Sequence, residues 1–168
     1  NPAHIAADLL SQAEHDVRAR AVLITNSETL ATAVSEEVDK QLAVLPRKEI
    51  AEQAIANRSF IAIMDDVEDM FELMNEVAPE HLEVQLPDPM QYMSLIENAG
   101  SVFLGQYASE PVGDYIGGPN HVLPTGGTAR FSSPLGVYDF VKRTSFSQFT
   151  RQRLEELAPH ITTLARTE

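Results

Sequence analysis

Short apolar runs rich in β-branched residues alternate with amphipathic segments along most of this chain. The apolar runs cover residues 20–25, 59–64, 81–86 and 101–105, and helical periodicity fills the segments 27–43, 46–56, 66–78 and 88–100. Strands that alternate with helices at such short spacings form βαβ units, in which the strands are parallel and covered by helices. The pattern therefore predicts an α/β fold, an incomplete Rossmann-like and mostly parallel sheet with flanking helices.

The two ends of the chain add further elements. Residues 3–16 carry apolar side chains at helical spacing and predict an amphipathic helix before the first strand. Residues 138–142 and 151–168 also predict helices, with a weak strand-like run over 144–150 between them. We therefore expect an α/β domain over residues 1–134, which carries the candidate chemistry, and a short helical C-terminal appendage over residues 135–168.

Charge and cysteine content narrow the possible functions. The formal net charge of −13 repels a phosphate backbone, and no basic stripe with interleaved aromatic residues offsets it, so we expect no nucleic-acid partner. No apolar run approaches the roughly 18 residues that a membrane helix needs, so we expect no membrane partner. The chain has no cysteine, which fits a cytoplasmic location and leaves nitrogen and oxygen ligands for any metal.

The segment 112–136 holds six of the chain's eight glycines, with Asp114 as its only acid and His121 as its only histidine. Glycines let a backbone take positive φ and approach a ligand closely. The segment follows a predicted strand, and ligands of parallel sheets bind at the carboxyl ends of strands. Its spacing matches neither the dinucleotide-binding nor the phosphate-loop glycine pattern. Asp114 and His121 are therefore candidate site residues in an irregular loop, and an ordered surface loop is the alternative.

Two further pairs of residues are candidates for chemistry. Gln12 and His15 are three residues apart on the predicted first helix, so their side chains can converge on one divalent metal. Glu80 and His81 follow Pro79 at the start of a predicted strand. Adjacent strand residues point to opposite faces, so this pair serves one site only if the chain is still irregular there. A carboxylate and an imidazole together commonly move protons near neutral pH. Taken alone, each pair is equally compatible with exposed surface.

The segments SQAEHD, APEHLEV and VGDYIGGPNHVLPTGGTARFSSPLGVYDFVKRTS resemble the histidinol dehydrogenase family, in this order and at matching spacings. The last segment is long and highly particular and carries most of the resemblance, whereas the two short motifs are weak on their own. The resemblance runs along the whole chain. It implies a zinc- and NAD-dependent enzyme that completes histidine biosynthesis.

The resemblance also implies roles for individual residues. Gln12, His15 and Asp114 match the zinc ligands that the family contributes from this part of the chain. Glu80 and His81 match the family's acid–base pair. These assignments come from the matched motifs, and the spacing of the residues alone does not establish them.

The implied reaction oxidises L-histidinol to L-histidine in two NAD-dependent steps by way of histidinal. Zinc would orient the amine and the imidazole of histidinol beside the three ligands, which is a template role. His81 would touch the substrate and take the alcohol proton, and Glu80 would activate the water that attacks the aldehyde. His121 would line the substrate pocket.

Members of this family are more than twice as long as this chain. The resemblance implies that the NAD site lies in an N-terminal portion that this chain lacks. A further histidine ligand and a substrate-binding glutamate would come from an extreme C-terminus, which reaches the site from the partner subunit of a homodimer. We therefore expect a C-terminal fragment that holds most of the metal and catalytic groups and does not turn over histidinol alone.

Two other hypotheses remain open at this stage. The chain can be a non-catalytic α/β interaction module whose glycine-rich segment only organises packing, in which case Gln12, His15 and Asp114 lie far apart or point away from one another. It can also self-associate, because the loss of a companion domain exposes apolar surface and large apolar patches drive association.

Overall fold

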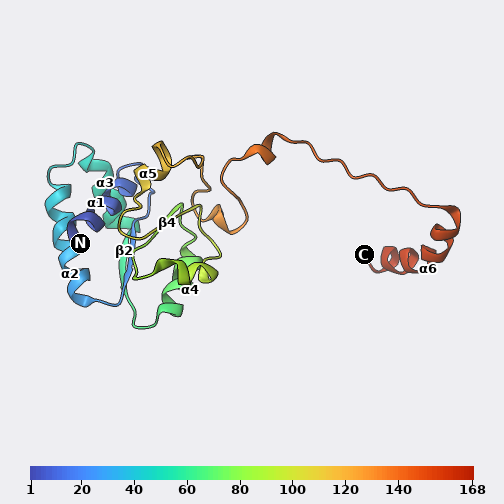
Figure 1. Ribbon diagram of the computed structural model, residues 1–168, viewed down its shortest axis with the longest axis horizontal. Helices are drawn as coiled ribbons and strands as arrows, with labels where there is room; N and C mark the ends of the chain where they lie inside the picture. Colours follow the sequence, from blue (N-terminus) through green and yellow to red (C-terminus); the bar gives the residue numbers. More distant parts are fainter. The chain divides into compact units, whose positions relative to one another are not determined.

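The computed structural model describes residues 1–168 and divides them into two compact units, Asn1–Gly136 and Val137–Glu168. In the first unit the elements are, in order, α1 (Pro2–Ala13), β1 (Val22–Thr25), α2 (Glu28–Leu42), α3 (Lys48–Arg58), β2 (Phe60–Ile63), α4 (Val67–Val77), β3 (His81–Val84), the 3-10 helix η1 (Pro89–Leu95), β4 (Ser101–Leu104), α5 (Glu110–Tyr115) and the 3-10 helix η2 (Thr128–Arg130) (Figure 1). The second unit holds the 3-10 helix η3 (Val137–Phe140) and α6 (Arg151–Thr167). No helix is long and apolar enough to cross a membrane.

The four strands form two parallel pairs. β1 pairs with β2, with Val22 opposite Phe60, and β3 pairs with β4, with His81 opposite Ser101. The predicted α/β class with parallel strands and flanking helices is confirmed. The strands make two two-stranded sheets rather than one continuous sheet. The two sheets are in packing contact, because Ile24 of β1 packs against the hydrophobic cluster that contains Val84 of β3.

The first core lies between α1, α2 and α3. Alanines at the contact positions let the three helices approach closely, and Val34 at the centre is fully buried. Burying one valine side chain completely contributes about 1.5–3 kcal/mol. The buried residues of this core are Ala6, Leu10, Ala13, Val34, Val38, Leu42, Ala51 and Ala54. Figure 1 shows the three helices gathered on one side of β2.

The second core lies under β3 and β4. Phe71 and Met74 of α4 pack against Val84, with Leu82 partly buried at the edge. Successive strand side chains point to opposite faces, so Leu82 and Val84 face this core while His81 and Glu83 face the other way. Side chains of α1 and α5 contact that second face at His81. The alternation of β3 therefore separates a packing face from a polar face.

The first helix is shorter than the sequence predicts. It ends at Ala13, and His15 lies in a bend beyond it. The Oδ1 atom of Asp16 accepts from the backbone N–H of Arg18 at 2.8 Å and from its Nε at 3.1 Å. Such local side-chain bonds compete with helical hydrogen bonds and end helices. The expected placement of Gln12 and His15 on adjacent turns of one helix is therefore wrong.

The segment 88–100 is also different from its predicted helix, because only Pro89–Leu95 is helical and it is a 3-10 helix. Tertiary hydrogen bonds from α4 explain the difference. The Oδ1 atom of Asn75 accepts from the backbone N–H groups of Glu97 and Asn98 at 2.8 and 3.0 Å, and its Nδ2 donates to the carbonyl of Leu95 at 2.8 Å. These bonds take the backbone groups that a continuing helix would need.

The glycine-rich segment begins in a helix rather than in the expected irregular loop. Asp114 lies on α5, which starts at Glu110 with Pro111 in its first turn, a position where proline is favoured. Gly113 is the residue that lets α5 lie against β4, because a Cβ there would come within 2.5 Å of Cε1 of Phe103. The remainder of the segment is irregular apart from η2.

In the second unit, the predicted C-terminal helix is present as α6. The helix predicted over residues 138–142 is only the 3-10 helix η3, and the strand-like run over 144–150 forms no strand. A strand needs a partner for its backbone N–H and C=O groups, and this run is not part of either strand pair. Phe146 and Phe149 of the run are 93% and 60% exposed.

Candidate active site

Glu80 and His81 lie at the junction between α4 and β3. Ala78 adopts a left-handed conformation with φ of 49°, Pro79 follows, and β3 starts at His81. The carbonyls of Pro79 and Glu80 accept from the backbone N–H groups of Gly100 and Ser101 at 2.9 and 2.8 Å. Glu80 therefore lies just before the regular strand. Because the backbone is still irregular at this position, the side chains of Glu80 and His81 can both point to one site.

The side-chain amide of Gln12 joins these two residues. Its Nε2 donates to Oε2 of Glu80 at 3.3 Å, and its Oε1 lies 3.0 Å from Nδ1 of His81. An ionised carboxylate only accepts hydrogen bonds, so the nitrogen of the amide has to face Glu80 and the oxygen has to face His81. That oxygen is also only an acceptor, and Nδ1 of His81 must therefore carry a proton.

Asp114 approaches His81 from the other side. Its Oδ1 lies 3.8 Å from Nε2 of His81, and the two side chains are 20% and 13% exposed. The ring of Phe103 lies tilted beside the imidazole, with centroids 6.1 Å apart. The Nε2 atom itself is buried and has no hydrogen-bond partner. Contacts from α1, β4 and α5 thus fix the imidazole and leave one nitrogen directed toward carboxylates.

Glu110 is a site residue that the sequence analysis missed. Its Oε2 accepts from Oγ of Ser11 at 3.3 Å, and ligand atoms of Glu110, Asp114 and His81 all lie within 4.8 Å of one another. Burial raises the pKa of Glu110, and hydrogen bonding to Asp114 raises it further. A spacing of four residues places two side chains on one helix face, and this signal was lost because the segment was interpreted as a loop.

A second carboxyl pair lies on the same face of β3. Burial and then the negative charge of Asp8 raise the pKa of Glu83 to about 7, and burial also raises the pKa of Asp8. Asp8 precedes Gln12 by one turn of α1, and Glu83 follows His81 by two residues on β3. Helix α1 therefore contacts β3 at two neighbouring positions: Gln12 meets His81 within the site, and Asp8 meets Glu83 next to it.

The other two predicted site residues do not join this cluster. His15 is exposed, and its hydrogen bonds are made by its backbone: its N–H donates to the carbonyl of Gln12 at 3.4 Å, and its carbonyl accepts from Nη2 of Arg47 at 3.5 Å. His121 is exposed in the loop after α5. The cluster also lies at the amino end of β3 rather than at a carboxyl end as expected. The chain turns back after β4, so α5 brings Asp114 beside His81.

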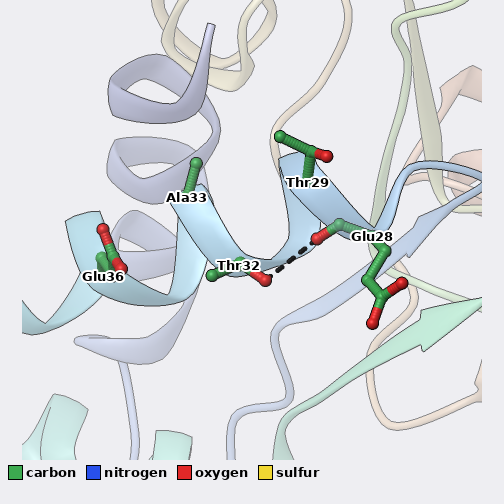
Figure 2. A pocket seen from close by; sticks show the side chains of 5 residues that line it. All are labelled: Glu28, Thr29, Thr32, Ala33 and Glu36. Atoms are coloured by element: carbon green, nitrogen blue, oxygen red, sulfur yellow. Dashed lines mark hydrogen bonds between the residues drawn. The ribbon is translucent and has the colours of Figure 1, made fainter.

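A surface hollow on α2 lies apart from these residues. Figure 2 shows its lining, which comes entirely from α2, and the hydrogen bond from Oγ1 of Thr32 to the carbonyl of Glu28, which is 3.0 Å long. The lining residues are Glu28, Thr29, Thr32, Ala33 and Glu36. None of them is buried, and none is among the predicted site residues.

An imidazole that is 13% exposed and held between an amide and a carboxylate, on the polar face of parallel strands, defines a candidate active site in an α/β protein. Comparison with known proteins specifies the family. The family model for histidinol dehydrogenase matches residues 1–168. The chain belongs to the histidinol dehydrogenase family, whose name denotes oxidoreductases.

Individual relatives agree with this family. The chain is 67% identical over 168 residues to a histidinol dehydrogenase of Lactiplantibacillus plantarum and 59% identical to one of Listeria monocytogenes, and it spans 39% of the length of each. The crystal structure of histidinol dehydrogenase from Elizabethkingia anophelis superposes with a TM-score of 0.82 at 38% identity, over 99% of this chain and 38% of that one. This chain therefore corresponds to well under half the length of these relatives.

Proposed function

We propose that this chain supplies metal-binding and acid–base groups to an enzyme that oxidises L-histidinol to L-histidine in two NAD-dependent steps. The observation that supports this most is the convergence of Gln12, Glu80, His81 and Asp114, which come from three separate segments and meet around one imidazole. A module that serves only as a packing surface has no need of such a convergence. The similarity to histidinol dehydrogenases supplies the substrate class.

The side chains present fit a zinc ion. Imidazole nitrogen and carboxylate oxygen are common zinc ligands. Asp114 offers a carboxylate within the cluster, and the imidazole of His15 lies exposed outside it. We assign Gln12, His15 and Asp114 as ligands from the family motifs. Zinc, when bound, supplies a positive charge that orients the amine and imidazole of histidinol. A carbonyl oxygen has two lone pairs, so Oε1 of Gln12 can accept from His81 and also serve as a ligand.

The acid–base work falls to Glu80 and His81. Nε2 of His81 is the nitrogen free to take the alcohol proton, because Nδ1 is held by Oε1 of Gln12. Glu80 then acts on the water that attacks the aldehyde, and the donor Nε2 of Gln12 holds its carboxylate in place. His121 is a pocket residue in this proposal and reaches the substrate from the loop after α5. A general base has to lie within hydrogen-bond reach of the proton it takes.

The rest of the proposed enzyme lies outside this chain. We place the nicotinamide site in the part of the relatives that this chain does not span, and we place the remaining zinc ligand on the partner subunit of a homodimer. The exposed apolar stripe of α6, formed by Leu154, Ile161 and Leu164, supports a subunit contact. By this proposal the chain alone, in a cytoplasmic setting, binds metal and does not oxidise histidinol.

Zinc calorimetry on the purified chain at neutral pH tests the assignment. We expect His15→Ala and Asp114→Ala each to weaken binding by about tenfold, or about 1.4 kcal/mol, while circular dichroism shows an intact fold. His160→Ala, an exposed change on α6, is the matched control and keeps the native affinity. Equal affinities in all four proteins would remove the support for the zinc site and favour the interaction module. Production of NADH from histidinol by the chain alone would contradict its inactivity.

A further inference from the structure

The C-terminal end of α4 leads directly into the segment that carries Glu80 and His81. Ala78 closes this helix in a left-handed conformation, with φ of 49° and ψ of 64°, and its N–H donates to the carbonyl of Met74 at 2.9 Å. A residue with a Cβ rarely takes this conformation, and a residue before a proline, here Pro79, prefers an extended backbone. Such a conformation persists only where the surrounding structure holds it, and Ala78 is buried.

The last carbonyls of α4 need partners from outside the helix. The N–H of Ala78 satisfies one of them, and the proline that follows has no N–H to satisfy another. The carbonyl of Asn75 accepts from Nδ2 of Asn98 at 3.2 Å. The carbonyl of Glu76 accepts from Nη2 of Arg130, and a positive charge is favourable at this end of a helix. Arg130, which comes from the glycine-rich segment, therefore takes part in capping α4.

The local structure around Arg130 directs its side chain to this helix end. The Oγ1 and the backbone N–H of Thr128 donate to the carbonyl of Thr125 at 2.8 and 3.1 Å, which closes a tight turn at η2. Nη1 of Arg130 donates to the carbonyl of Gly127 at 3.0 Å, so one guanidinium bridges the turn and the helix. Gly127 has a φ of 85°, and a Cβ there would lie 2.5 Å from Nη1 of Arg130. A side chain at this position would therefore displace the guanidinium.

The glycine-rich segment also supports the residues that follow Ala78. The N–H of Gly100 donates to the carbonyl of Pro79 at 2.9 Å. A Cβ at Gly100 would lie 2.6 Å from the carbonyl oxygen of Glu80 and 3.2 Å from Cδ of Pro124, and Pro124 is buried. The turn before β3 is thus held at its beginning by Arg130 and at its end by Gly100, against which Pro124 packs.

We propose that Arg130 is a positioning residue for the proposed acid–base pair. Its guanidinium holds the end of α4 and thereby keeps Ala78 left-handed, and the turn then places Glu80 and His81 where both contact the amide of Gln12. The proposal rests on the proposed function for the acid–base roles of these two residues. The path from the guanidinium to the imidazole depends only on contacts within this chain.

Nitrogen–proton NMR of the His81 imidazole in Arg130→Ala tests this role. Without the guanidinium the turn relaxes and the bond between Gln12 and Nδ1 weakens, so we expect the ratio of the Nδ1–H to the Nε2–H form in the folded chain to fall by about threefold or more. Arg130→Lys keeps a positive donor without the guanidinium fork and should give an intermediate ratio. Arg58→Ala, a change of an exposed arginine in the last turn of α3, is the matched control and keeps the native ratio.

The native ratio in a folded Arg130→Ala chain overturns the proposal. A role in stability alone would lower the free energy of unfolding, which urea unfolding measures, and would leave the tautomers of the folded chain unchanged.

Ala78→Gly tests whether Arg130 acts through the turn. Glycine takes the left-handed conformation without the cost of a Cβ, so the turn then depends less on the guanidinium. We expect Arg130→Ala combined with Ala78→Gly to recover the native ratio, and a folded double variant that keeps the ratio of Arg130→Ala overturns the proposal. These measurements need neither zinc nor turnover. A chain that fails in zinc calorimetry while its tautomers respond to Arg130 would count against the proposed metal site and support the positioning role.

Discussion

Gln12 on α1 and His81 on β3 are 69 positions apart in the sequence, and their side chains meet at 3.0 Å between Oε1 and Nδ1. The contact sets which nitrogen of the imidazole carries hydrogen, and it does so because Glu80 fixes the other end of the amide. One glutamine therefore positions both members of the proposed acid–base pair. Neither motif reveals this relationship when considered alone.

Removal of the Gln12 amide should change the ratio of the two neutral tautomers of the His81 imidazole. In Gln12→Ala we expect the Nδ1–H form to lose its dominance, since no acceptor then holds the proton on that nitrogen. Gln12→Glu should retain it, because a carboxylate oxygen still accepts from Nδ1. Two-dimensional nitrogen–proton NMR of the imidazole measures both forms. Gln53→Ala on the exposed face of α3 is the control, and an unchanged tautomer in Gln12→Ala would contradict the prediction.

Gly113 should be intolerant of any side chain. A Cβ at this position would lie 2.5 Å from Cε1 and 2.9 Å from Cζ of Phe103, whose ring is buried and cannot yield freely. We expect Gly113→Ala to lower the free energy of unfolding by about 1–3 kcal/mol, as overpacked sites do, and to weaken zinc binding because α5 moves away from His81. Gly136→Ala is the control, since its nearest neighbour would be 3.9 Å away. Urea unfolding measures the stability of the two variants, and equal free energies of unfolding for Gly113→Ala and Gly136→Ala would contradict the packing argument.

Local sequence pattern was enough to place the four strands, because each short apolar run is bounded by segments of different periodicity. The alternation of polar and apolar residues in β3 also predicted which side chains face the core and which face away from it. Those features depend on residues next to one another in sequence, which is why they could be predicted.

The features that could not be predicted depend on contacts between distant residues. Asn75 ends the helical path after Leu95 through hydrogen bonds across about twenty positions. Glu110 was missed because Pro111 and Gly113 both suggest a loop, whereas proline suits a first helical turn and the glycine is required by Phe103. Helical spacing from Gln12 and the family motifs both made His15 a candidate, but α1 ends at Ala13 and the structure leaves His15 exposed.

The carboxyl pair of Glu83 and Asp8 should make stability depend on pH. The folded state raises the pKa of Glu83 from 4.5 to about 7, so between these values it binds more protons than the unfolded state. Stability is then full below about pH 4.5, and part of it is lost as the pH rises toward 7. The side chain is only half-buried, so we expect a loss of about 1 kcal/mol after solvent screening.

Glu83→Gln should flatten this dependence, because the amide does not titrate. Urea unfolding at pH 5 and pH 7.5 measures it, and Glu52→Gln is the control that keeps the native slope. Asp8→Asn should have a similar effect, since the charge of Asp8 is one cause of the raised pKa of Glu83. Native stability that rises between these two pH values, with a rise that disappears in Glu83→Gln, would show that the carboxylate is the favoured form and contradict the prediction.

The apolar side chains of the second unit should drive self-association. No residue of α6 is buried, and Leu154 and Leu164 are 52% and 72% exposed on a common stripe. Exposed apolar patches of this kind mark interaction surfaces. We expect sedimentation of the native chain to show a dimer at micromolar concentration and Leu164→Glu to weaken the dimer by about tenfold or more. Arg166→Glu changes charge on the same helix without removing apolar surface and is the control. A native chain that stays monomeric at high concentration, or a dimer that Leu164→Glu leaves intact, would exclude α6 as the subunit contact.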